Sequence, residues 1–196
     1  MNMTQEGSNL QMYQIEKILD GEYISEGQVW EHLLIHQLAK IPQFIDKLLS
    51  LDEEFDKKTL RKVYEFFSEE DSCYRKNTPV LIHLGYNPVL PQEIDDELNS
   101  LFRKVRWEDN KDPVEKAVIL HDGIIRIYPF KRWNEIIARA ALEYALIYYG
   151  EDFCPVTLSE QEYNQAVSYS IIHKKNPVLI QNLRAGILMR KSVEQL

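Results

Sequence analysis

The stretch that decides the fold is Asp112-PVEKAVILHDGIIRIYPFKRWNEIIARAALEYALIYY-Gly150, which predicts two consecutive helices joined by a short loop. Asp112 followed by Pro113 is a helix start, because an aspartate side chain caps the first turn and proline suits the first helical position. Apolar residues then recur every three or four positions, as on one face of a helix. A second helix is predicted over Asn134–Tyr149, where Gly150 ends it.

Most of the remaining chain is also patterned as helices. Helices are predicted over 8–19, 25–42, 44–49, 57–67, 92–105, 159–173 and 177–189, with Pro42 either kinking the second of these or opening the third. Between Thr78 and Pro88 the sequence is rich in β-formers and bounded by prolines, which predicts a short hairpin. We call this hairpin the flap, with the residues Thr78, Val80, Leu81, Ile82 and His83. The predicted fold class is mainly α, a helical bundle with a short β-hairpin flap.

Composition limits the class of protein. The chain has 196 residues and a formal net charge of -8, which suits one domain over 1–196 and argues against nucleic-acid binding. Its apolar runs are too short to cross a membrane, and no signal peptide is visible. Cys73 and Cys154 are expected to be reduced thiols. We expect a cytoplasmic protein, with a bacterial effector exported without a cleaved signal as the alternative.

Residues 113 to about 186 resemble the Fic/Doc (Fido) family. The family pattern is a helix ending in an LH pair, then an H-P-F-x-D/E-G-N-G-R-x-x-R loop that leads into a central helix. Here the corresponding residues are Leu120-His121 and then YPFKRWNEIIAR over 128–139. Gly150, Pro155 and Tyr163 match the family's tail pattern, and Cys73-Tyr74-Arg75 with the flap is similar to its YR segment and substrate-docking flap. The resemblance implies three segments: N-terminal helices over 1–70, a flap over 71–91, and a core with C-terminal helices over 92–196.

The match to the catalytic loop is uneven. Pro129, Phe130, Asn134 and Arg139 agree with the pattern. The departures are Tyr128 for the histidine, Arg132 for the acid, Trp133 and Glu135 for the two glycines, and Ile136 for the first arginine.

Each departure has a chemical consequence. The family histidine is a general base, whereas a phenol has an ordinary pKa of about 10 and costs about 4 kcal/mol to ionise at pH 7. The family acid holds Mg²⁺, which Arg132 cannot do. Trp133 and Glu135 fill the space at which phosphate approaches a helix N-terminus. Ile136 removes a guanidinium. The resemblance therefore implies a degenerate site without AMP-transferase activity, in which Tyr128, Arg132 and Asn134 occupy the catalytic positions.

Several weaker candidates remain. The candidate ligands for a nucleotide or another anion are Lys131, Arg132, Asn134 and Arg139. ATP or another nucleotide is the candidate ligand, and Mg²⁺ is not expected.

The segment Ile24-Ser25-Glu26-Gly27 is similar to the inhibitory-helix motif of Fic proteins, although Glu22 stands at its Ser/Thr position. An ion pair between Glu26 and Arg139 is therefore a hypothesis. His32 and His36 have metal-ligand spacing but no third ligand, and no metal site is predicted. His121 lies on an apolar stripe and is interpreted as a satisfied, partly buried histidine rather than a catalytic one.

The sequence leaves two candidate functions open, one of a binding module and one of an enzyme. The first is a protein-binding or regulatory module, whose flap docks a partner's extended segment. A second copy of the chain, forming a homo-oligomer, is a further candidate partner. The second is an atypical Fic-type nucleotidyl- or phosphotransferase that modifies a protein hydroxyl with non-standard loop residues. Nucleotide binding with turnover distinguishes the second from the first.

Overall fold

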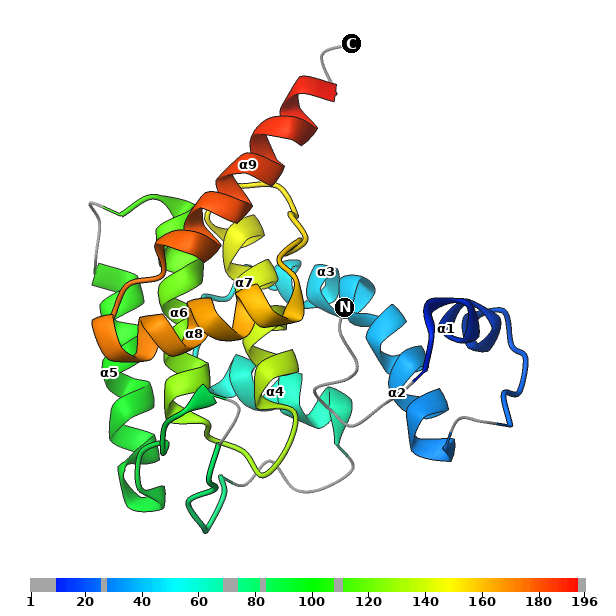
Figure 1. Cartoon of the computed structure of the whole chain (residues 1–196). Coiled ribbons are helices and arrows are strands. Elements are labelled where there is room, and N and C mark those ends of the chain that lie inside the picture. Colours follow the sequence, from blue (N-terminus) through cyan, green and yellow to red (C-terminus); the bar gives the residue numbers. More distant parts are fainter. Residues whose placement is uncertain (1–9, 26–27, 69–73, 82–83, 108–110, 194–196) are drawn as a thin grey trace. The chain divides into compact units, whose positions relative to one another are not determined.

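The computed structural model describes residues 10–25, 28–68, 74–81, 84–107 and 111–193. It divides into two compact units, Met1–Ser50 and Leu51–Leu196. The predicted single domain and its three segments stay predictions. Helices dominate both units, which confirms the mainly α class (Figure 1). Within the described ranges, no helix combines the length and apolar character that crossing a bilayer requires.

The first unit contains α1 (Met12–Leu19), α2 (Val29–Ala39) and α3 (Ile41–Leu49). α2 contacts both α1 and α3. Pro42 lies in the first turn of α3 and therefore opens that helix rather than kinking the one before it. The prediction began α2 at Ser25, too early by four residues, because Gln28 caps the helix with a capping box to Glu31.

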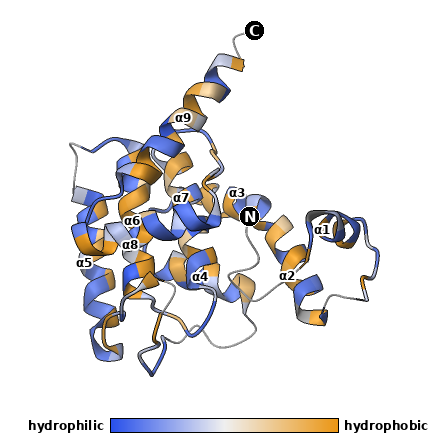
Figure 2. Cartoon of the chain, viewed as in Figure 1, coloured by the Kyte–Doolittle hydropathy of each residue, from blue (hydrophilic) through white to orange (hydrophobic). Residues whose placement is uncertain are grey.

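The second unit contains α4 (Lys57–Phe67), the short 3-10 turn η3 (Pro91–Glu93), α5 (Ile94–Trp107), α6 (Pro113–Ile127), α7 (Asn134–Tyr148), α8 (Glu160–His173) and α9 (Pro177–Val193). α6 and α7 form the most extensive helix pair and the centre of this unit (Figure 1). Figure 2 shows hydrophobic positions along much of both helices, which fits their burial among the others. As predicted, Asp112 caps α6: its side chain accepts a hydrogen bond of 2.8 Å from the Glu115 amide.

Small residues let the central helices approach closely. A Cβ atom at Gly123 of α6 would collide with the side chain of Leu101, so glycine sets the distance between α5 and α6. On α7 the small residues Ala140, Ala141 and Ala145 are all buried. α6 contacts α5, α7, α8 and α9 in turn.

The segment predicted as a hairpin is less regular than expected. Among its described residues, one isolated antiparallel bridge joins Leu81 to Tyr86. The amides of Leu84 and Gly85 both donate to the Leu81 carbonyl, at 3.1 and 3.0 Å, which makes a tight turn. The flap residues Ile82 and His83 lie outside the described residues. The β-hairpin flap therefore stays a prediction.

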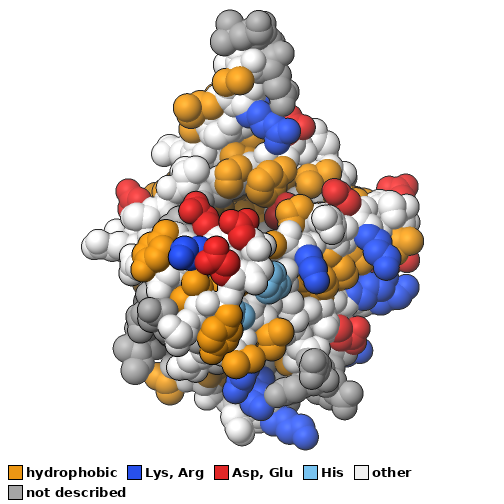
Figure 3. All heavy atoms as spheres, turned by 90° about the vertical axis from the view of Figure 1, so that its right-hand side faces the viewer, with side chains coloured by type: hydrophobic (Ala, Val, Ile, Leu, Met, Phe, Trp, Pro, Cys, Tyr) orange, Lys and Arg blue, Asp and Glu red, His pale blue; other side chains and the backbone are white. Residues whose placement is uncertain are grey.

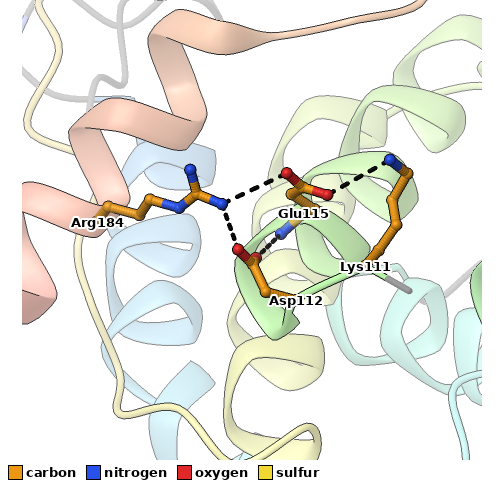
Figure 4. Close-up of polar contacts among 4 residues, drawn as sticks. All are labelled: Lys111, Asp112, Glu115 and Arg184. Carbon is orange, nitrogen blue, oxygen red and sulfur yellow. Dashed lines mark hydrogen bonds and ion pairs between the residues drawn. The ribbon is translucent and has the colours of Figure 1, made fainter. Parts of the chain in front are cut away.

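α9 closes the unit and extends four residues beyond its predicted end at Met189. Arg184 pairs with Asp112 and, at 3.4 Å, with Glu115, which Lys111 also contacts (Figure 4). Further along the chain, Cys154 is buried beneath α9: its Sγ lies 3.5 Å from the Leu183 carbonyl oxygen and would collide with any Cβ at Gly186.

Candidate functional site

The loop between α6 and α7 is bounded by two residues in left-handed backbone conformation. Tyr128 follows the last residue of α6 with φ 50° and ψ 60°, and its amide donates to the Ile124 carbonyl at 2.8 Å. Trp133 precedes α7 with φ 66° and ψ 10°. A side chain with a Cβ is disfavoured in this region by about 1–2 kcal/mol. Contacts outside the loop must therefore stabilise its backbone.

Arg75 supplies a large share of those contacts. Its amide donates to the Pro129 carbonyl at 2.9 Å, and its Nε donates to the Tyr128 carbonyl at 2.7 Å. The two terminal nitrogens reach the carbonyls of Asn77 at 3.0 Å, Ile127 at 3.2 Å, and Val89. Arg75 is 6% exposed, and burial lowers its pKa. The side chain joins three segments of the chain through their backbone atoms.

Asn134 and Phe130 fix the loop from inside. Asn134 is fully buried; its side chain accepts from the Phe130 amide at 2.9 Å and donates to the Phe130 carbonyl at 2.8 Å. The Phe130 ring is also fully buried and stacks on Tyr64 of α4, with ring centroids 4.2 Å apart. An amide side chain can make both hydrogen bonds at once because it carries a donor and an acceptor. The Asn134 side chain therefore stabilises the backbone of the loop.

The first turn of α7 is closed by buried side chains. Glu135 is 7% exposed and Ile136 is 8% exposed. Across from them, Tyr86 donates its hydroxyl to the Ile125 carbonyl. Burial raises the pKa of Tyr86, and the nearby Tyr128 and Glu135 raise it further. Two phenols and a carboxyl group thus lie close together at the positive end of α7.

A buried polar chain runs from α6 to α8. His121, which is fully buried, contacts Asp122 Oδ1 through Nδ1 and the Tyr163 hydroxyl through Nε2, both at 2.8 Å. Asn176 also donates to Asp122 at 3.2 Å. The Arg139 guanidinium lies over the Tyr163 ring, 4.2 Å from its centroid. Burial raises the pKa of Tyr163, and Arg139 partly offsets that rise.

Comparisons with known proteins agree with this architecture. A family model described as the Fic/DOC family matches residues 50–146, which include α4 to α6, the loop and most of α7. The chain contains a Fic domain. No curated protein matches the sequence.

Solved structures of Fic proteins share the fold. Fic-1 (residues 134–508) from C. elegans superposes with a TM-score of 0.77 at 19% identity, covering 98% of this chain and 61% of that one. A Fic family protein from Desulfovibrio desulfuricans G20 gives 0.77 at 14% identity, covering 99% and 63%. A Fic domain containing signaling protein from Bacteroides thetaiotaomicron gives 0.71 at 20% identity, covering 96% and 84%. The chain thus spans less than two thirds of the length of the first two.

The structure brings together some of the predicted site residues of the Fic domain and separates others. Tyr128 and Asn134 lie at the two ends of the loop, whereas Lys131 and Arg132 are exposed on it. Arg139 points to Tyr163. Glu26 lies outside the described residues, so the Glu26–Arg139 ion pair stays a prediction.

The described flap residues differ in exposure. Thr78 is exposed, and the Val80 side chain is 73% exposed, whereas Leu81 is buried.

His121 is buried and fully hydrogen-bonded, which confirms the interpretation from its apolar stripe. His32 donates a hydrogen bond from Nε2 to the Ile24 carbonyl at 3.1 Å. In the described part of the chain, no three His, Cys, Asp or Glu side chains are placed to hold a metal ion.

Sequence reasoning assigned no role to three residues that shape the site. Arg75 belongs to the YR segment of the resemblance, and an arginine just before a proline-bounded segment could have indicated a backbone ligand. Tyr163 belongs to the tail pattern of the resemblance, which gives it no bonding partner, and Tyr86 is one tyrosine among the 11 of the chain. Their hydrogen bonds to Ile125 and His121 depend on tertiary packing, which sequence periodicity does not encode.

Proposed function

We propose that this Fic domain does not transfer AMP and acts as a protein-binding or regulatory module. The observation that carries the proposal is the buried carboxyl group of Glu135 in the first turn of α7. A helix N-terminus attracts anions through its free amides and its dipole. Glu135 places a carboxylate of the chain itself at this position. Its charge repels a nucleotide phosphate, and its side chain occupies the space that the phosphate would need.

The neighbouring residues support the same conclusion. Ile136 is buried and uncharged at the position where the family pattern has an arginine, so a phosphate loses a bidentate donor there. Tyr128 stands where the pattern has a general base, and the Mg²⁺-binding acid is replaced by Arg132, which is exposed. A magnesium ion needs hard oxygen ligands, and a guanidinium offers none.

Arg139 favours a structural role over the alternative function. In an atypical transferase, Arg132 and Arg139 would share the phosphate contacts. The Arg139 guanidinium instead lies over the Tyr163 ring, whose hydroxyl is engaged by His121. This cation–π contact inside the protein contributes to the packing of α7 against α8.

The binding surface of the proposed module is the flap. Thr78 and Val80 are exposed on either side of Pro79, where they are accessible to an extended segment of a protein partner. A second copy of the chain is a further candidate for that segment. The buried Leu81 anchors the exposed residues to the domain.

The first test is nucleotide binding. Titration calorimetry of the native chain with ATP, CTP, GTP and UTP, each with Mg²⁺ and with EDTA, should give no heat at millimolar ligand. The double variant E135G/I136R removes the internal anion and restores the guanidinium, so we expect it to bind ATP. E135Q/I136R is the matched control, since it retains the side-chain volume and removes the charge. AMP transfer by the native chain would refute the proposal.

The second test concerns the flap. A photo-crosslinking amino acid at Val80 should trap a discrete protein adduct in cells, whereas the same group at Val178, which is 45% exposed on α9, should not. Mass spectrometry of the adduct separates a distinct partner from a second copy of the chain. Equal or absent labelling at the two positions would contradict a binding role for the flap.

A further inference from the structure

A cavity of the second unit lies beside α6. It has a volume of about 720 Å³, and its lining residues belong to α5, α6, the end of α8 and the start of α9. The described loop residues over 128–134 do not line it. Its size is in the range of sites for small organic ligands.

The charge of this cavity is opposite to that of the whole chain. The chain carries a formal net charge of -8. The cavity is lined by two carboxylates, Glu115 and Asp122, but by five cationic side chains, Lys104, Lys111, Arg126, Lys174 and Lys175. A local surplus of positive charge in an acidic protein raises the local concentration of anions.

Internal pairing accounts for part of these charges. Lys111 pairs with Glu115 at 3.4 Å, and Arg126 pairs with Glu97 at 3.1 Å. Asp122 is engaged by His121 and Asn176. Lys174 and Lys175 are exposed and have no ion-pair partner within the described ranges. A ligand can therefore reach these two cations of the cavity without breaking an ion pair.

The backbone adds to the attraction at the same place. Lys174 has a left-handed conformation with φ 56° and ends α8, so the chain reverses there into α9. Asn176 is buried and accepts from the Leu179 amide at 3.1 Å, and α9 begins at Pro177. The positive end of the 17-residue helix α9 therefore lies beside the two lysines.

Part of the lining is apolar. It includes Leu101 of α5, Val118 and Ile119 of α6 and Ile180 of α9, and Tyr169 adds an aromatic ring that is 47% exposed. A ligand that fills the cavity needs an apolar or aromatic part for this part of the lining. It also needs a compact group with two negative charges for the lysines.

We propose that this cavity, lined by α5, α6, α8 and α9, binds a small organic phosphate with an apolar or aromatic part, through Lys174, Lys175 and the N-terminus of α9. This site is independent of the loop residues and of the function proposed above. Its ligand would couple the positions of α8 and α9, because the two lysines belong to the turn that joins these helices.

The test is an NMR titration of the ¹⁵N-labelled full chain with phenyl phosphate. We expect saturable shifts of amides over 174–180 and 118–126, and weaker binding of inorganic phosphate, which lacks the apolar part. The double variant K174E/K175E should weaken binding by at least about tenfold, since each charged hydrogen bond is worth that much. The control K40E/K47E makes the same charge change on exposed lysines of the first unit and should leave the affinity unchanged.

A steric variant provides an independent arm. Ser100 is an exposed residue of α5 that lines the cavity, and S100W fills it without changing the charge. Loss of binding in both S100W and K174E/K175E, with the melting temperature retained, supports the site. Shifts that do not saturate, that centre on residues 128–139, or that weaken equally in K40E/K47E would overturn it.

Discussion

Replacing Arg75 by alanine removes a side chain that donates hydrogen bonds to four backbone carbonyls, those of Tyr128, Asn77, Ile127 and Val89. A hydrogen bond from a charged donor contributes about 1.5–3 kcal/mol, and water entering the vacated space replaces part of it. With four such bonds at a position that is 6% exposed, we expect the free energy of unfolding to fall by about 3–5 kcal/mol. For a chain of this length that is a decrease of roughly 10 °C in melting temperature.

The assay combines urea denaturation with limited trypsin digestion. Trypsin reports on the loop directly, because Lys131 and Arg132 are exposed and become cleavable when the backbone around them loosens. R75K retains the charge but cannot match the fork of the guanidinium, so it should recover less than half of the loss. The control R103A removes an exposed arginine of α5 and should change little.

One result would refute the reasoning about Arg75. If R75A unfolds within about 1 kcal/mol of the native chain and its loop is cleaved at the native rate, the loop does not depend on this side chain. The contacts of Asn134 and Phe130 would then be sufficient to hold it.

Three further predictions concern other parts of the second unit. Removing the Tyr163 hydroxyl in Y163F should cost about 1–3 kcal/mol by leaving His121 with an unmatched nitrogen, and urea unfolding of Y163F, H121F and the double variant should reveal coupling between them. W133G should be more stable than W133A by about 1 kcal/mol, since only glycine adopts the left-handed φ without strain; equal melting temperatures would contradict this. Burial opposes ionisation of Asp112, but hydrogen bonds from the Glu115 amide and from Arg184 outweigh it and lower its pKa. Above pH 4 the native chain should therefore be more stable than D112N by about 0.5 kcal/mol. This difference should disappear as the pH falls through the lowered pKa of Asp112 in the folded state. A difference in melting temperature that stays constant across that pH range would contradict the prediction.

The helices were predictable where a local signal marks their ends. α6 begins at Pro113 because Asp112 caps it, and α4 begins at Lys57, where the Asp56 side chain accepts from the Thr59 amide at 2.8 Å. Both helices have the predicted bounds. α9 runs past Met189 because the residues that follow, Arg190 to Val193, contain no glycine or proline to end it.

The site was less predictable, since its geometry depends on contacts between distant segments. The loop sequence identified Tyr128 and Asn134, but their arrangement relies on Arg75, which lies 53 residues before Tyr128 in sequence. The flap was interpreted as a hairpin from its β-formers. Its described residues form a turn with one bridge, because prolines at 79 and 88 cannot donate to a ladder.

The burial of Cys154 beneath α9 provides a reporter of how firmly that helix is held. A thiol pressed against Gly186 and the Leu183 carbonyl cannot meet a reagent until α9 lifts away, and burial also raises its pKa and so keeps it unreactive. In a C73S background, the rate of alkylation of Cys154 therefore measures the opening of α9. A molecule that tightens the turn between α8 and α9 would slow the alkylation, which gives a chemical read-out of events at the far end of the same helix.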